Sequence, residues 1–197
     1  PRDQLTPFWC PTEPMTFLGW GKTTQLGYSL GLALGAKVAH PDKLCINYWG
    51  DAAIGFTGMD FETAVRERIP ILSILCNNFS MATEIGVMNQ SHDKYGTMNI
   101  SGNYADMAKA VGGYGERITD PNGIVAALER GIAATQRGEA VLLEFQSASV
   151  PTRVLQFSLD FLVQMAALIA VFLVLGAASA AAIACESERF QAAWQAL

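Results

Sequence analysis

Two long apolar runs mark the first half of the chain, and each ends in polar residues. The runs span 44–49 and 71–76; Gly50-Asp51 follows the first and Asn77-Asn78 follows the second. Runs of this length, rich in Ile, Leu and aromatic residues, are typical of strands buried on both faces of a sheet. Between them, apolar residues recur at helical spacing over 59–69. The pattern therefore predicts a strand, a helix and a second, parallel strand.

Similar patterns on both sides of this unit predict more elements of the same kinds. Strands are expected at 15–20, 112–118 and 140–145, and helices at about 19–39, 104–111 and 121–137. Strands that alternate with helices of this length predict an α/β domain, with a parallel sheet and helices on both faces. The stretch 79–103 is polar with few apolar repeats, so we expect a long functional loop there.

The two ends of the chain depart from this alternation. Residues 1–14 hold four prolines and predict an irregular segment that leads into a domain at 15–147. Because the chain starts at Pro1 without a methionine, we expect it to be a fragment of a longer protein. The tail, 148–197, contains 24 uncharged residues at 161–184, a C-terminal hydrophobic helix about 36 Å long if fully helical. Three interpretations stay open: a transmembrane helix, a buried oligomerisation helix, or a segment foreign to the domain.

Composition and charge narrow the classes of protein. With 197 residues, 51% hydrophobic and 16% charged, the chain can bury a sizeable core and is not disordered. A net charge of −5, without a basic cluster, argues against nucleic acid as a partner. The four cysteines are scattered, with no CxxC pair and no secretory signal. We therefore expect free thiols, Cys45 and Cys76 inside strands, and a cytoplasmic protein with membrane association only through 161–184.

Candidate chemistry lies where the two apolar runs end. Because the carboxyl ends of parallel strands meet at one edge of a sheet, Asp51 and Asn78 should be neighbours there. Carboxylate and amide oxygens are ligands that Mg²⁺ accepts alongside phosphate oxygens. The peptide N–H groups of Ala52 and Ala53 would open the following helix and face an anion. The sequence therefore predicts a metal–phosphate site.

These residues also carry a resemblance to a known family. Gly50-Asp51-Ala52 followed by Asn77-Asn78, with Asn78 27 positions after Asp51, resembles the diphosphate-and-metal motif of thiamine diphosphate (ThDP) enzymes. The text over 50–63 is similar to the acetolactate-synthase-like branch, and also to oxalyl-CoA decarboxylase and 2-hydroxyacyl-CoA lyase. The similarity covers roughly residues 15 to 147 and implies the ThDP-binding fold.

The resemblance implies roles for the residues of the motif. Asp51 and the Asn78 side chain would bind Mg²⁺, and the backbone carbonyl of Ser80 would complete the protein ligands. Gly50, Ala52 and Ala53 would lie against the diphosphate. Ala52 stands where many relatives have glycine, which is tolerable if its φ stays negative.

A second stretch, 24–27, aligns with the turn that shapes the cofactor in this family. Leu26 would be the apolar wedge that bends ThDP, and the Thr24 carbonyl would accept a hydrogen bond from its aminopyrimidine amine. From its own position alone, Leu26 would be interpreted as a core residue; the neighbouring metal motif favours the cofactor role.

The implied chemistry is decarboxylation of a 2-oxo acid, cleavage next to a carbonyl, or joining of the product to a second carbonyl compound, as a transferase or lyase. The cofactor is the electron sink, and the protein supplies placement and electrostatics. In this family the glutamate that activates the aminopyrimidine belongs to a separate pyrimidine-binding domain, normally on another subunit. The resemblance thus implies a homo-oligomer, allows FAD in the full-length enzyme, and predicts that this chain alone is inactive.

Other interpretations compete with this one. Gly21-Lys22-Thr23 invites a phosphate-loop interpretation, but a P-loop needs glycine at the place of Thr16. A non-catalytic, membrane-tethered interaction module that keeps the fold is a further alternative. Glu84 and His92 in the expected loop are candidates for acid–base work, although a single titratable loop residue is usually solvated.

Overall fold

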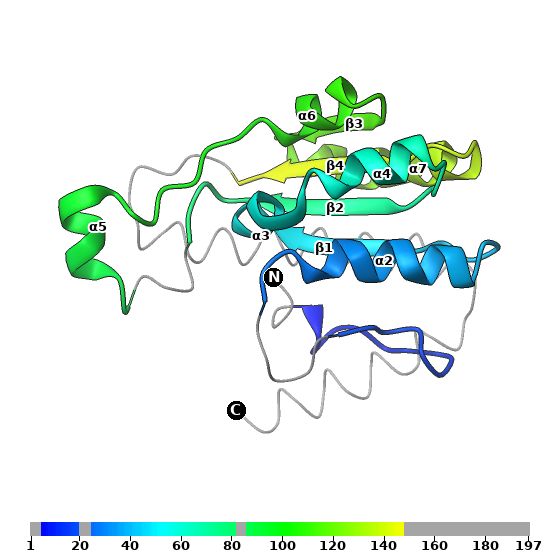
Figure 1. Ribbon diagram of the computed structural model, residues 1–197, viewed down its shortest axis with the longest axis horizontal. Helices are drawn as coiled ribbons and strands as arrows, with labels where there is room; N and C mark the ends of the chain where they lie inside the picture. The colour runs from blue at the N-terminus through cyan, green and yellow to red at the C-terminus, as the bar shows by residue number, and fades with distance from the viewer. Residues whose placement is uncertain (1–4, 20–24, 82–85, 148–197) are drawn as a thin grey trace.

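The computed structural model describes residues 5–19, 25–81 and 86–147, and its centre is a sheet of parallel strands (Figure 1). The strands are β1 (Ile46–Gly50), β2 (Leu72–Asn77), β3 (Tyr114–Ile118) and β4 (Val141–Gln146). Their order across the sheet is β1-β2-β4-β3, and every neighbouring pair is parallel. The predicted parallel sheet is therefore confirmed.

Helices cover both faces of this sheet. They are α2 (Tyr28–Ala39), α3 (Asp51–Thr57), α4 (Asp60–Arg66), α5 (Asn89–Tyr95), α6 (Tyr104–Ala110), the 3₁₀ turn η2 (Pro121–Gly123) and α7 (Ile124–Gln136). One core cluster joins the sheet to α2, α3, α4 and α6, and includes Leu30, Ile54, Phe61 and Ala108. The other joins the opposite face to α7 through Ile124, Ala127 and Leu128. Helices on both faces were predicted, and this too is confirmed.

Strand register brings the polar strand ends together. Gly50 of β1 pairs with Cys76 of β2, and Asn77 pairs with Gln146 of β4. Asp51, the residue after β1, is therefore level with the end of β2. Side chains of both strands alternate between the two core clusters, so the runs are apolar on both faces as expected.

Three expectations about individual elements are wrong, and a fourth is confirmed with shorter bounds. Residues 15–19 form no strand, and Met15 has a φ of 64°. The first long helix begins at Tyr28 rather than near residue 19, because Gly27 has a φ of 86° and no helix continues through that conformation. The helix expected at 59–69 is confirmed as the shorter α4, which the separate helix α3 precedes. Cys45 lies just before β1 and is only half-buried, whereas Cys76 is buried in β2.

The stretch expected to be a loop contains a helix, α5, which projects from the sheet body (Figure 1). None of its seven residues is buried. An apolar repeat arises where a helix packs on a core, and α5 has no such contact, so the periodicity that reveals buried helices is missing here.

The tail at 148–197, with the hydrophobic helix and membrane span expected at 161–184, lies outside the described residues. Within the described ranges, no helix is both long and apolar enough to cross a bilayer.

Candidate functional site

Asp51 occupies the point where β1 passes into α3, at the carboxyl edge of the sheet. Its side chain is buried, at 4% exposed. Its Oδ1 accepts a hydrogen bond from the N–H of Ala52 at 2.8 Å, and its Oδ2 accepts one from the N–H of Ser80 at 3.2 Å. The carboxylate is thus held in place by the backbone on both sides.

The environment of Asp51 disfavours its charge. Burial raises the pKa of Asp51 from 3.8 to about 6, while backbone N–H groups, those of Ala52 and Ser80 first, act in the opposite direction. A buried carboxylate in this position gains much from a nearby cation, because the cation favours the charged form.

Asn78 shares a hydrogen-bond donor with Asp51. The N–H of Ser80 also donates to the Asn78 Oδ1, at 3.1 Å. Two side-chain oxygens, one from each strand end, therefore converge on a single backbone amide. The sequence-predicted metal ligands Asp51, Asn78 and Ser80 are brought together in this way.

A tight turn at 77–80 presents these groups. Phe79 has a φ of 58°, a left-handed conformation at the bend that follows β2. Beyond it, Ser80 forms an isolated antiparallel bridge with Asn99, flanked by bonds from Met81 N to Met98 O and from Ile100 N to Phe79 O. Because these bonds flank the Ser80–Asn99 pair, the N–H and C=O of Ser80 itself point away from Asn99. On that side the N–H of Ser80 reaches Asp51.

The predicted diphosphate residues lie beside Asp51. Gly50 caps α3, while Ala52 and Ala53 lie in its first turn with ordinary helical backbone. Ala52 therefore has the negative φ that its departure from glycine requires. Its N–H, however, already donates to Asp51 Oδ1, so this amide is engaged within the chain.

Leu26 lies in the turn before α2 and packs against the core cluster beneath α3. The turn is fixed to α3, because the Thr57 hydroxyl donates to the Gly27 carbonyl at 2.7 Å. A Cβ on Gly27 would come within 2.9 Å of the Ala53 carbonyl, so no larger residue fits there. Thr24, Lys22 and Glu84 lie outside the described residues.

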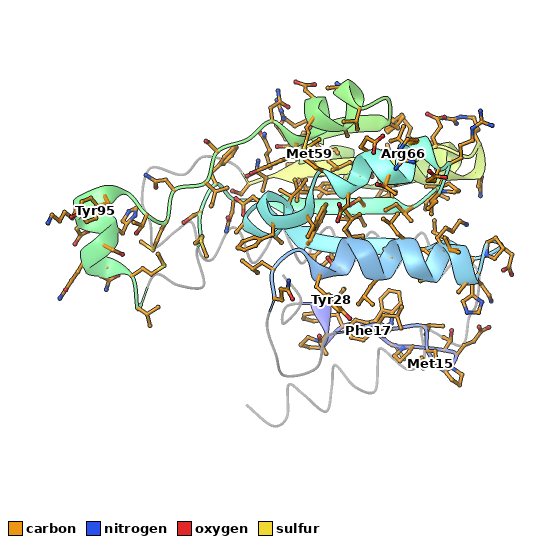
Figure 2. The ribbon with its side chains drawn as sticks, in the orientation of Figure 1. Met15, Phe17, Tyr28, Met59, Arg66 and Tyr95 are labelled. Carbon is orange, nitrogen blue, oxygen red and sulfur yellow. The ribbon has the colours of Figure 1, made fainter. Side chains whose placement is uncertain are left out.

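His92 lies apart from this arrangement. It belongs to α5, where its Nδ1 accepts a hydrogen bond from the N–H of Met98 at 3.3 Å. Figure 2 shows Tyr95 of the same helix far from Tyr28 and Met59 on the sheet body, and Tyr95 is 69% exposed. The structure therefore does not bring His92 to Asp51.

Two residues near the site were missed by the sequence analysis. Glu144 of β4 is fully buried, at 0% exposed, and four donors surround its carboxylate. Although burial acts to raise it, the pKa of Glu144 lies below its usual value because of these donors. The signal in the sequence is a charged residue within the apolar run 140–145, whose apolar character predicts only a buried strand.

Tyr104, the first residue of α6, is the second residue that was missed. Its hydroxyl donates to the backbone carbonyl of Asp51 at 3.4 Å. Burial, followed by the charges of Asp51 and Glu144, raises the pKa of Tyr104. No sequence pattern separates this tyrosine from an ordinary helix residue, because the contact joins segments 53 positions apart.

The donor set is oxygen-rich but carries little charge. Within the described part of the chain, no three His, Cys, Asp or Glu side chains gather into a metal cluster. The set at this edge is one carboxylate, one amide and one backbone carbonyl. This set fits a hard divalent cation that takes its other ligands from phosphate and water, as Mg²⁺ does.

Comparison with known proteins identifies the family. Residues 4–145 match the family model "Thiamine pyrophosphate enzyme, C-terminal TPP binding domain". A probable acetolactate synthase of Mycobacterium bovis is 30% identical over 71% of this chain and 26% of its own length. A 2-hydroxyacyl-CoA lyase 2 of Caenorhabditis elegans is 31% identical over 66% of this chain and 21% of its own.

A solved structure shares the fold. It is the thiamine diphosphate-dependent 4-hydroxybenzoylformate decarboxylase of Rhodococcus jostii, with a TM-score of 0.55 and 22% identity over 64% of this chain and 24% of that one. The chain thus spans about a quarter of the length of the relatives it matches. It belongs to the thiamine pyrophosphate enzymes, as their C-terminal TPP-binding domain, and is similar to the acetolactate-synthase-like branch of that family.

Proposed function

We propose that this chain binds the diphosphate of ThDP through Mg²⁺, with Asp51, Asn78 and the carbonyl of Ser80 as the metal ligands. One observation carries the proposal: Asp51 Oδ2 and Asn78 Oδ1 converge on the N–H of Ser80 at the carboxyl edge of a parallel sheet. Ligands bind at that edge in open α/β sheets. Both side-chain oxygens can turn from the amide to a cation without moving the backbone.

The remaining contacts of the cofactor follow from the same placement. Gly50, Ala52 and Ala53 line the start of α3 beside Asp51, where the diphosphate would lie. The Ala52 amide donates to Asp51 Oδ1, and it would be open to the diphosphate if Asp51 bound Mg²⁺ through that oxygen instead. Leu26 and Thr24 would shape the organic part of the cofactor, since the turn at 26–27 is fixed against α3.

The function of the complete enzyme is proposed from the relatives. We expect an acetolactate-synthase-like enzyme that acts on 2-oxo acids, by decarboxylation or by joining two carbonyl compounds, as a homo-oligomer with a pyrimidine-binding domain. ThDP supplies the electron sink when it is bound. The protein residues described here hold and orient the diphosphate end of the cofactor. FAD in the full-length enzyme remains an expectation from the resemblance alone.

A second candidate function rests on a specific similarity. The 2-hydroxyacyl-CoA lyase relative matches this chain as well as the acetolactate synthase does, at 31% and 30% identity. A screen of the full-length enzyme with 2-oxo acids and with CoA thioesters separates the two. Activity confined to the CoA thioesters would replace the acetolactate-synthase-like function with the lyase or an oxalyl-CoA decarboxylase.

The binding proposal is tested by calorimetric titration of the 197-residue chain with ThDP, with and without Mg²⁺. We expect Mg²⁺-dependent binding, weakened about tenfold or more in Asn78→Ala because one metal ligand is lost. Gln136→Ala is the matched control, since it removes an exposed side-chain amide at the end of α7. Binding that is independent of Mg²⁺, or equal in Asn78→Ala and the parent chain, contradicts the proposed site.

A further inference from the structure

The interior of the sheet holds a charged group that the proposed cofactor contacts do not use. Glu144 projects from β4 with no exposure to solvent. A carboxylate in such a place is costly unless donors surround it. Its Oε1 accepts from Asn77 Nδ2 at 2.8 Å and from Gln146 Nε2 at 2.9 Å. Its Oε2 accepts from the N–H of Ala105 at 2.8 Å and from Arg117 Nε at 3.4 Å.

The Oε1 side leads directly to the metal-binding turn. Asn77 donates to Glu144 through its Nδ2, and its Oδ1 accepts from the N–H of Phe79 at 3.1 Å. An ionised carboxylate can only accept, so it fixes which end of the Asn77 amide faces Phe79. The Asn77 oxygen must face the turn, where its hydrogen bond to the N–H of Phe79 holds the left-handed backbone of that residue in place.

The Oε2 side leads to the other wall of the site. Ala105 is the second residue of α6, so Glu144 anchors the start of that helix. Its neighbour Tyr104 donates to the carbonyl of Asp51. One carboxylate therefore connects the turn after β2 with the helix that contacts Asp51.

We propose that Glu144 is a positioning residue for the metal-binding turn. Acting through Asn77, it fixes the backbone that carries Asn78 and Ser80, and so sets the spacing of the metal ligands. The effect on metal binding rests on the proposed function, but the hydrogen bonds from Glu144 through Asn77 to Phe79 exist in the chain without any cofactor.

The variant Glu144→Gln tests the relay because it changes donors and acceptors without changing shape. The oxygen of the introduced amide should keep the Ala105 and Arg117 side, since a backbone N–H and a cation cannot become acceptors. The NH₂ of that amide then faces Asn77, which must turn its own oxygen toward position 144 to accept from it. The NH₂ of Asn77 then faces the N–H of Phe79, so that two donors oppose each other. We expect amide exchange at Phe79, measured by NMR without cofactor, to be about tenfold faster.

Exchanging the carboxylate at position 144 with the amide at position 77 should restore the hydrogen bond to Phe79. In Glu144→Gln with Asn77→Asp, the carboxylate at 77 accepts from both the introduced amide and the N–H of Phe79, while Gln146 can present its own oxygen. We expect exchange at Phe79 to return close to the parent rate. The affinity for Mg²⁺-ThDP should fall about tenfold or more in Glu144→Gln and recover most of this loss in the double variant.

A matched control separates positioning from loss of stability. Ser73→Ala removes the partner of the Asn47 amide, a second buried polar pair in β1 and β2 away from the turn. It should destabilise the chain. Once this loss of global stability is allowed for, the exchange rate at Phe79 and the Mg²⁺-ThDP affinity should equal those of the parent chain.

The outcomes distinguish this inference from the proposed function. Unchanged exchange at Phe79 in Glu144→Gln, or a double variant that exchanges fast or fails to fold, overturns the role of Glu144. Absence of Mg²⁺-dependent ThDP binding in the parent chain overturns the proposed function instead. A Phe79 response that equals that of Ser73→Ala shows a purely structural carboxylate and also overturns the proposal.

Discussion

Asp51 is held in a place that does not suit its charge. Nearly all of its surface is buried, and in the described part of the chain its negative charge is stabilised by hydrogen bonds from backbone N–H groups. A cation between Asp51 and Asn78 would supply the missing charge. The burial of Asp51 therefore lowers the stability of the metal-free chain, and such a cost is common at functional positions, as the proposed metal site would be.

The cost of burying Asp51 in the metal-free chain should depend on pH. The pKa in the folded state is about 6 and the unfolded value is 3.8, so the folded chain binds the proton more tightly. The folded state is therefore favoured most below about pH 4, and this contribution is lost as pH rises through about 6. The loss amounts to about 3 kcal/mol, at about 1.4 kcal/mol for each pH unit between the two pKa values.

The measurement is urea unfolding of the parent chain and Asp51→Asn between pH 4 and pH 8, with EDTA present. Between pH 4 and pH 8 the stability of Asp51→Asn should rise by about 2.5 kcal/mol relative to that of the parent chain, because a small part of the effect is already present at pH 4. Asp120→Asn, at an exposed carboxylate, provides the control. A difference between Asp51→Asn and the parent that stays constant with pH would show that burial does not perturb this carboxyl group.

At the scale of elements, the packing of α6 on β3 determines how one wall of the site is built. Gly115 of β3 lies so close to α6 that a Cβ there would come within 1.9 Å of the Ala105 carbonyl oxygen. The neighbour is backbone, which cannot rotate away. Glycine is required for this approach, and the Ala105 amide that donates to Glu144 depends on it.

Gly115→Ala should therefore destabilise the fold by about 3 kcal/mol or more, because α6 must move away from the sheet. Gly35→Ala is the matched substitution, since nothing lies within 4 Å of a Cβ in the middle of α2. It should stabilise the chain by about 0.5–1 kcal/mol through helix propensity. Equal unfolding midpoints for the two variants in guanidinium chloride would contradict the close approach.

The sequence predicted elements well where burial produces a pattern. The strands that end at Asp51 and Asn78 are long apolar runs, so the edge that they share could be predicted. The start of α2 could not, because apolar spacing continues across the Gly27 turn. The helix α5 gives no pattern, since none of its residues is buried. The strand at 15–20 was expected from an apolar run, but residues 15–19 of that run form no strand.

The same limit applies to the site. Asp51 and Asn78 could be proposed because each follows directly from a strand end. The relay from Glu144 through Asn77 to Phe79 joins positions 67 apart, and only the folded register brings them together. Long-range hydrogen bonds of this kind leave no periodicity in the chain.

At the scale of the whole molecule, the proposed site accounts for contacts to the diphosphate end of the cofactor only. In the described structure, two carboxyl groups are hydrogen-bonded to residues of the turn at 77–80: Asp51 accepts from the N–H of Ser80, and Glu144 accepts from the side chain of Asn77. Asp51 is assigned to the metal, and Glu144 is enclosed by four donors. His92 lies on the projecting α5. The two carboxyl groups hydrogen-bonded to this turn are thus both accounted for, one by the proposed metal and the other by its donors.

We therefore predict that the purified chain binds ThDP and turns over no substrate. Holding the diphosphate places the cofactor, but reaction requires a group that activates its aminopyrimidine, and we expect that group from the pyrimidine-binding domain. The measurement is release of labelled CO₂ from pyruvate with saturating ThDP and Mg²⁺, on a preparation whose ThDP binding has been verified. Adding a separately produced pyrimidine-binding domain from a relative should restore turnover if the surfaces match. Release of CO₂ by the chain alone would mean that its own residues activate the cofactor, and Glu84, outside the described ranges, would become the first residue to replace.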